Sequence, residues 1–155
     1  MTQPTLPGEG MHPGDCTPRL TFLPVRTDPL VRAIRHLEAA VCSARSAQPD
    51  FFATRLQRVR RELEAHQRLT AGPDGLLDDV VQHSPHLNHR ADKLRADHHH
   101  LDHQFESLHT ALIEVDDARW SLLDALKLLS DLRHHHAQGT DLALDAYFTD
   151  GGAGD

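Results

Sequence analysis

Residues 94–112 read LRADHHHLDHQFESLHTAL, and the spacing of apolar residues in this stretch decides the fold. A helix turns by about 100° per residue, so apolar residues spaced by three or four positions share one face. Such a stripe is formed here by Leu94, Leu101, Phe105, Leu108 and Leu112. His98 falls within the stripe, whereas His99 and His103 fall on the opposite face. The stretch therefore predicts an amphipathic helix with one imidazole turned toward the core.

Three further segments carry stripes of the same kind, separated by helix-breaking residues. Asp28 can cap a helix and Pro29 suits the first helical position, where a missing N–H does no harm. The predicted helices span about residues 28–45, 50–70, 84–114 and 116–139. A separate short apolar segment is expected at 142–148, after Gly139. Four long helices with short links predict an all-α fold, an up-down four-helix bundle.

The chain is expected to contain one folded domain. Its length of 155 residues suits a single core. Prolines and glycines recur throughout residues 1–27, so this arm is predicted to lack a fixed helix or strand. The predicted domains are therefore an arm at 1–27, the bundle at 28–150 and a tail at 151–155.

Charge and composition exclude several classes of function. A net charge of -7, with acidic and basic residues interleaved, argues against a nucleic-acid partner. No apolar run long enough to cross a membrane and no signal-peptide pattern is present, so a cytoplasmic location is the expectation. Nothing resembles a nucleophile with its base or a nucleotide-binding loop, so the sequence gives little support to an enzyme.

The unusual feature is a total of 14 histidines, and helical phase sorts them. In the second predicted helix His66 extends the stripe formed by Phe52, Leu56, Val59 and Leu63. In the fourth, His136 is expected to continue the stripe of Leu122, Ala125, Leu126, Leu129 and Leu132. His134 is then predicted to point away and His135 to the side. A hairpin turning near residues 116–117 would bring His98 and His136 to the same height, and Asp102 could share a metal with His98 or orient its imidazole.

This pattern resembles the hemerythrin-like (HHE cation-binding) family over about residues 28–150. The matching pieces are Leu63-Glu64-Ala65-His66, Gly75-Leu76-Leu77, Leu94-Arg95-Ala96-Asp97-His98, and His136 with Asp141. The resemblance implies a four-helix bundle that holds non-haem iron, usually di-iron, with histidines and carboxylates. It implies His66, His98 and His136 as metal ligands, and Asp141 as a carboxylate ligand or as a partner that orients them. Asp102 is a candidate for the same two roles because of its position one turn beyond His98. For Asp141 to reach the metal of His136, the helix would have to distort near Gly139.

The sequence also departs from the family pattern. Thr70 stands where the family has a glutamate, and Asp102 stands where it has a second histidine. The remaining set suits a single divalent ion, iron or zinc, better than a di-iron centre. Three hypotheses follow. The first is a metal-binding protein with a sensing, storage or redox role, and the second is a bundle without metal that serves as an interaction or regulatory module, with a homodimer as one form. The third is a surface of exposed histidine runs that responds to pH or to divalent ions. In the second, the inward histidines are hydrogen-bonded core residues.

Overall fold

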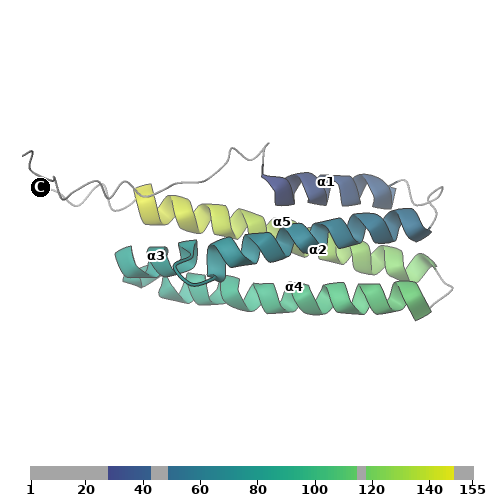
Figure 1. The fold of residues 1–155 in the computed structure, drawn as a ribbon. Helices are drawn as coiled ribbons and strands as arrows, with labels where there is room; N and C mark the ends of the chain where they lie inside the picture. The colour runs from purple at the N-terminus through teal and green to yellow at the C-terminus, as the bar shows by residue number, and fades with distance from the viewer. Residues whose placement is uncertain (1–27, 43–48, 115–117, 149–155) are drawn as a thin grey trace, which may run out of the picture.

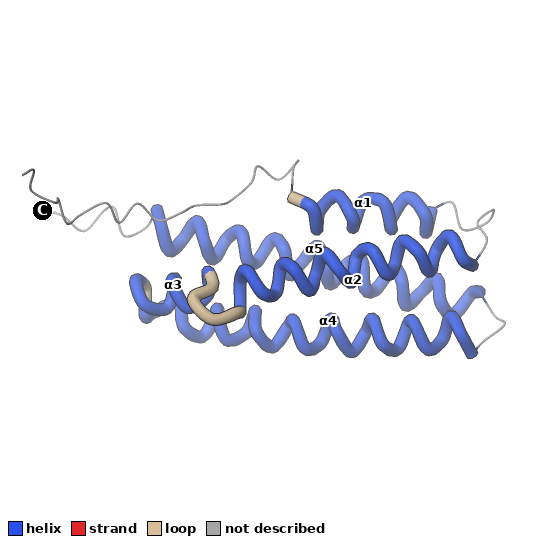
Figure 2. The backbone as a smooth tube through the Cα atoms, in the orientation of Figure 1, coloured by secondary structure: helices blue, strands red, loops and turns tan. Residues whose placement is uncertain are grey.

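The computed structural model describes residues 28–42, 49–114 and 118–148, and these residues form helices and short turns without a strand (Figure 2). The arm predicted at 1–27 and the tail at 151–155 lie outside the described residues. The elements are α1 (Pro29–Cys42), α2 (Pro49–Ala71), α3 (Leu76–His83), a 3-10 turn (Pro85–Leu87), α4 (Asn88–Glu114) and α5 (Ala118–Phe148).

The four long helices pack against one another, each running opposite to the next along the chain (Figure 1). Helix α1 packs on α2 and α5, and α4 packs on the same two helices. The short helix α3 lies at one end, against α2, α4 and α5. Because α1 has 14 residues and α5 has 31, α1 covers only part of the length of the bundle (Figure 1). The all-α prediction and the packing of four helices are confirmed.

Helix α1 begins where the sequence predicted. The Oδ1 atom of Asp28 accepts a hydrogen bond from the backbone N–H of Leu30 at 2.8 Å, and the Asp28 carbonyl accepts one from Arg32 at 3.1 Å. The first bond satisfies an N–H group that has no partner within the helix, and the second is the first regular bond of the helix. The cap therefore fixes the position of the Asp28 carboxylate, whose second oxygen forms a hydrogen bond with His136, as described below.

Helix α5 is longer than predicted, because it continues through Gly139 to Phe148 as one helix. The separate segment expected at 142–148 and the distortion expected near Gly139 are both absent. Leu142 and Ala146 are buried against α3 and the start of α4, so their packing outweighs the helix penalty of about 1 kcal/mol for one glycine. A regular helix also leaves Asp141 on the exposed side.

Replacing Gly139 with alanine is expected to stabilise the protein. A Cβ atom at this position meets no atom within 4 Å, and alanine lowers the conformational entropy of the unfolded chain. Gly139→Ala should raise the free energy of unfolding by about 0.5–1 kcal/mol and the melting temperature by roughly 2–4 °C. Gly72→Ala is the control, because its Cβ would lie 2.3 Å from the carbonyl oxygen of Arg68 and should destabilise the fold. Equal effects of the two variants in thermal melts would contradict the prediction.

Buried apolar side chains form two clusters rather than one continuous core. The larger joins α1, α2, α4 and α5 and includes Leu63, Leu101 and Leu132. The smaller lies at the α3 end of the bundle and includes Leu77, Leu94 and Leu142. In the sequence, the positions between these sets hold histidines. A polar layer thus separates the two clusters.

None of the helices in the described ranges is both long enough and apolar enough to cross a membrane.

Candidate metal centre

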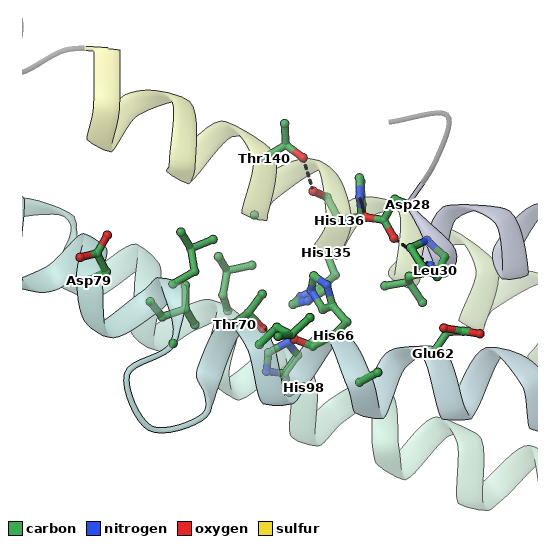
Figure 3. Close-up of a pocket in the computed structure, with 18 of the residues that line it drawn as sticks. Asp28, Leu30, Glu62, His66, Thr70, Asp79, His98, His135, His136 and Thr140 are labelled. Carbon is green, nitrogen blue, oxygen red and sulfur yellow. Dashed lines mark hydrogen bonds and ion pairs between the residues drawn. The ribbon is translucent and has the colours of Figure 1, made fainter. Parts of the chain in front are cut away.

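Three imidazoles meet in the layer between the two apolar clusters. His66 comes from α2, His98 from α4 and His135 from α5, and Figure 3 shows their rings converging. One ring nitrogen from each lies within 4.8 Å of the others. Three atoms so spaced lie at most about 2.8 Å from a common centre, so shifts below about 1 Å would reach the usual imidazole–metal distance of about 2.0–2.1 Å. The geometry fits a single ion.

Burial keeps these imidazoles neutral at physiological pH. Only 6% of His98 and 3% of His135 is exposed to solvent. Burial, reinforced by the neighbouring imidazoles, lowers the pKa of His98 to about 4 and that of His135 to about 3. Burial also lowers the pKa of His66, against the opposing effect of Asp28. A neutral imidazole keeps a free lone pair, which is the form that binds a metal.

Two nitrogens of the group have no hydrogen-bond partner among the described residues: His98 Nε2 and His135 Nδ1, both buried. Buried polar atoms in folded proteins nearly always have a partner, so each such atom needs a physical explanation. The nearest acidic group to His135 Nδ1 is the carboxylate of Asp97, whose Oδ2 lies 4.0 Å away, beyond hydrogen-bond distance. A metal ion in the group is one partner that would account for such nitrogens.

The structure brings His135, rather than His136, to His66 and His98. His136 is half-buried and turns toward α1, where its Nε2 lies 3.1 Å from Oδ2 of Asp28. This hydrogen bond lowers the pKa of the Asp28 carboxyl, which also caps α1. The expected direction of His135, toward the side of the helix, is corrected: its side chain points into the core.

The spacing of the buried residues along α5 explains why His135, rather than His136, faces the core. The buried positions Ala125, Leu128, Leu132 and His135 are spaced by three, four and three residues. Other positions of α5 are buried as well: Leu129, Leu142, Ala143 and Ala146. The sequence-based stripe included Leu126, which is 47% exposed, and stepped four residues from Leu132 to His136. The alternating spacing of a bundle seam would have selected His135.

Neither of the two carboxylates expected at the site joins the histidine group. Asp102 is exposed and accepts a hydrogen bond from Nε2 of Gln67 at 3.1 Å. Asp141 is exposed on the regular helix α5. Within the described ranges, the group of His66, His98 and His135 is the one set of three or more potential ligands found close enough to hold an ion.

The histidine group forms part of the wall of a pocket of about 680 Å³. This pocket lies where α1 begins, between α2 and α5, and the α2–α3 turn and α3 close one end of it. The pair Asp28 and His136 also lines it. An ion held by the three imidazoles would therefore lie beside a space large enough for a small molecule.

Comparison with known protein families, with curated proteins and with solved structures found no match. The fold and the site define a class nonetheless. This is an all-helical protein of four packed helices, with a buried three-histidine cluster that could hold a metal ion.

Proposed function

We propose that this protein binds one divalent transition-metal ion, zinc or iron, through His66, His98 and His135. The observation that carries the proposal is the convergence of three neutral imidazoles from three helices, two of them with buried nitrogens that lack hydrogen-bond partners. Imidazole nitrogens suit both zinc and iron. Three protein ligands leave a coordination position for water or another molecule, as in catalytic rather than purely structural zinc sites.

The energetics of the core support a role for this layer beyond packing. A buried nitrogen without a partner costs about 1–3 kcal/mol, and leucines at the same positions would join the two apolar clusters. Binding of an ion to His98 Nε2 would supply one missing partner, and the approach of His135 Nδ1 to Asp97 would supply the other; together they would offset the cost. The protein thus carries a layer that is unfavourable without a ligand, which is typical of functional sites.

The bundle itself supports a hemerythrin-like architecture for the proposed site. Four helices pack antiparallel, and three of them supply the histidines. Two of these, His66 and His98, are among the ligands that the resemblance implied. The third histidine that the resemblance implied was His136, whereas the third histidine of the group is its neighbour His135. Because Asp102 and Asp141 are exposed, the proposal is a mononuclear site with an open position, suited to sensing or redox chemistry.

Metal binding by protein purified without a histidine tag tests the proposal. Elemental analysis after incubation with Zn²⁺ or Fe²⁺ and gel filtration should give one equivalent per chain. His98→Ala and His135→Ala should abolish stoichiometric binding, because each removes one of three ligands. His99→Ala is the matched control, because the exposed neighbour of His98 should be dispensable.

The outcomes distinguish a site with His135 as the third histidine from a site with His136 in that place. Retained binding in His135→Ala with loss in His136→Ala would support the ligand set implied by the resemblance instead. An absence of stoichiometric metal in the wild-type protein would overturn the proposal and favour a metal-free interaction module.

Asp97 is expected to orient His135 when the metal is bound. A shift of about 1 Å would let His135 Nδ1–H donate to Asp97 Oδ2, leaving Nε2 for the ion. In the amide orientation that satisfies its neighbours, Gln138 donates to the same oxygen at 3.2 Å and holds it in place. Asp97→Asn should weaken zinc binding about tenfold in competition with a chromophoric chelator. Asp102→Asn should change affinity less than threefold, and an equal loss in both variants would contradict this role.

A further inference from the structure

The pocket beside the histidine group is elongated. Glu62 lies toward one end and Asp79 at the other, with the three imidazoles between them (Figure 3). Its volume of about 680 Å³ falls within the range of sites that enclose small organic molecules, about 300–1,000 Å³. A water molecule or a diatomic gas would fill only a small part of this space.

The walls of the pocket are mainly apolar on the α3 side of the imidazoles. Leu76 and Leu77 come from α3, Leu94 from α4, and Leu69 lies at the exposed edge. Gly139 faces the same space, and a Cβ added there would meet no atom within 4 Å. These walls suit an apolar body that extends from the position of the ion.

The polar groups of the pocket are mainly hydrogen-bond acceptors. Four carboxylates line it, and none of the described lining residues is a lysine or an arginine; the carboxylates are those of Asp28, Glu62, Asp74 and Asp79. The hydroxyls of Thr70 and Thr140 donate to backbone carbonyls of their own helices, at 2.8 and 3.0 Å. The Tyr147 hydroxyl donates to Asp79. Apart from a bound ion, the described side chains of the pocket therefore offer little that would stabilise the carboxylate or phosphate of a ligand.

We propose that the pocket binds a neutral nitrogen base with an apolar body, such as a substituted heteroaromatic. This inference rests on the proposed function, because the nitrogen would occupy the open position of the ion held by His66, His98 and His135. The apolar body would lie along Leu76, Leu77 and Leu94. Anions of similar shape would be attracted by the ion but repelled by the four carboxylates, with no lysine or arginine among the described lining residues to offset that repulsion.

Cobalt(II) in place of the native ion provides a test, because its visible absorption reports each change of coordination. The full-length cobalt protein is titrated at pH 7.5 with imidazole, 4-phenylimidazole and phenylacetate. We expect 4-phenylimidazole to bind at least tenfold more tightly than imidazole, because its phenyl ring gains the apolar wall. Phenylacetate should bind at least tenfold more weakly than 4-phenylimidazole.

Two variants locate the ligand in the pocket. Gly139→Leu should weaken 4-phenylimidazole binding at least tenfold and imidazole binding less than threefold, while Ala137→Leu on the exposed side of α5 should change neither. Leu69→Ala removes apolar surface at a residue that is 75% exposed, so it leaves the fold intact and should weaken 4-phenylimidazole about threefold.

The outcomes separate this inference from the proposed function. Cobalt that binds stoichiometrically but does not respond to 4-phenylimidazole would overturn the inference and leave the metal site standing. Phenylacetate binding as tightly as 4-phenylimidazole would also overturn it. A failure of cobalt to bind would overturn both.

Discussion

Acidification of the metal-free protein from pH 7 to pH 4.5 is expected to lower its free energy of unfolding by on the order of 5 kcal/mol. The pKa of His98 in the folded protein is about 4 and that of His135 about 3, against 6.5 when exposed. Below pH 6.5 the unfolded chain therefore binds protons that the folded protein excludes. The loss begins near pH 6.5, continues as the pH falls and levels off below about pH 3. Such a loss rivals the whole stability of many domains.

Urea denaturation of chelator-treated protein between pH 7 and 4.5 measures this effect. Above pH 4.5 the protonation of Asp28 contributes little, because its pKa is lowered. The double variant His98→Leu/His135→Leu should flatten the pH dependence. The matched double variant of exposed neighbours, His99→Leu/His134→Leu, should keep it. An unchanged slope in the first variant would show that other groups cause the acid sensitivity.

Binding of a metal ion is expected to raise the free energy of unfolding, and this is the second large effect on stability. Zinc at a free concentration of about 100 times its Kd should stabilise the folded state by up to about 2.7 kcal/mol, because it binds the assembled site more tightly than the unfolded chain. In a domain of this size the melting temperature should rise by roughly 6–10 °C. Thermal melts with zinc, and again after addition of a chelator, measure the shift and its reversal.

His135→Leu should be more stable than the wild type without metal but should not be stabilised further by zinc. Without metal this variant is expected to be more stable than wild type by about 1–3 kcal/mol, because an unpartnered buried nitrogen is replaced by apolar surface. With zinc it should gain nothing. His134→Leu, which alters an exposed neighbour, should respond to zinc like the wild type. A zinc response that survives in His135→Leu would exclude His135 as a ligand.

The fold could be predicted largely from local patterns. Asp28 and Pro29 mark the start of α1, and uninterrupted stripes in α2 and α4 correctly directed His66 and His98 inward. The end of α5 could not be predicted in this way, because Gly139 signals a break that the packing of Leu142 outweighs. That packing depends on α3, which is distant in the sequence.

The site was only partly predictable. In the run His134-His135-His136, neighbouring side chains differ by about 100° in direction, so a small error in helical phase selects a different residue. Leu126 and Leu128 are chemically identical, and only their neighbours in the bundle decide that the first is 47% exposed and the second 1%. The pocket depends on where the short α1 begins against α2 and α5, and no local pattern carries that information.

The histidine layer that separates the two apolar clusters also bears on how the protein unfolds. Leu77 and Leu142 lie in the smaller cluster, which the layer separates from the main core. Such a segment can open as a cooperative unit of its own while the rest stays folded. An ion bound by α2, α4 and α5 would join the two units by bonds to all three helices. Binding of the ion would then make local unfolding at the α3 end of the bundle rarer. A partner that binds this end in only one of its two states could detect the change.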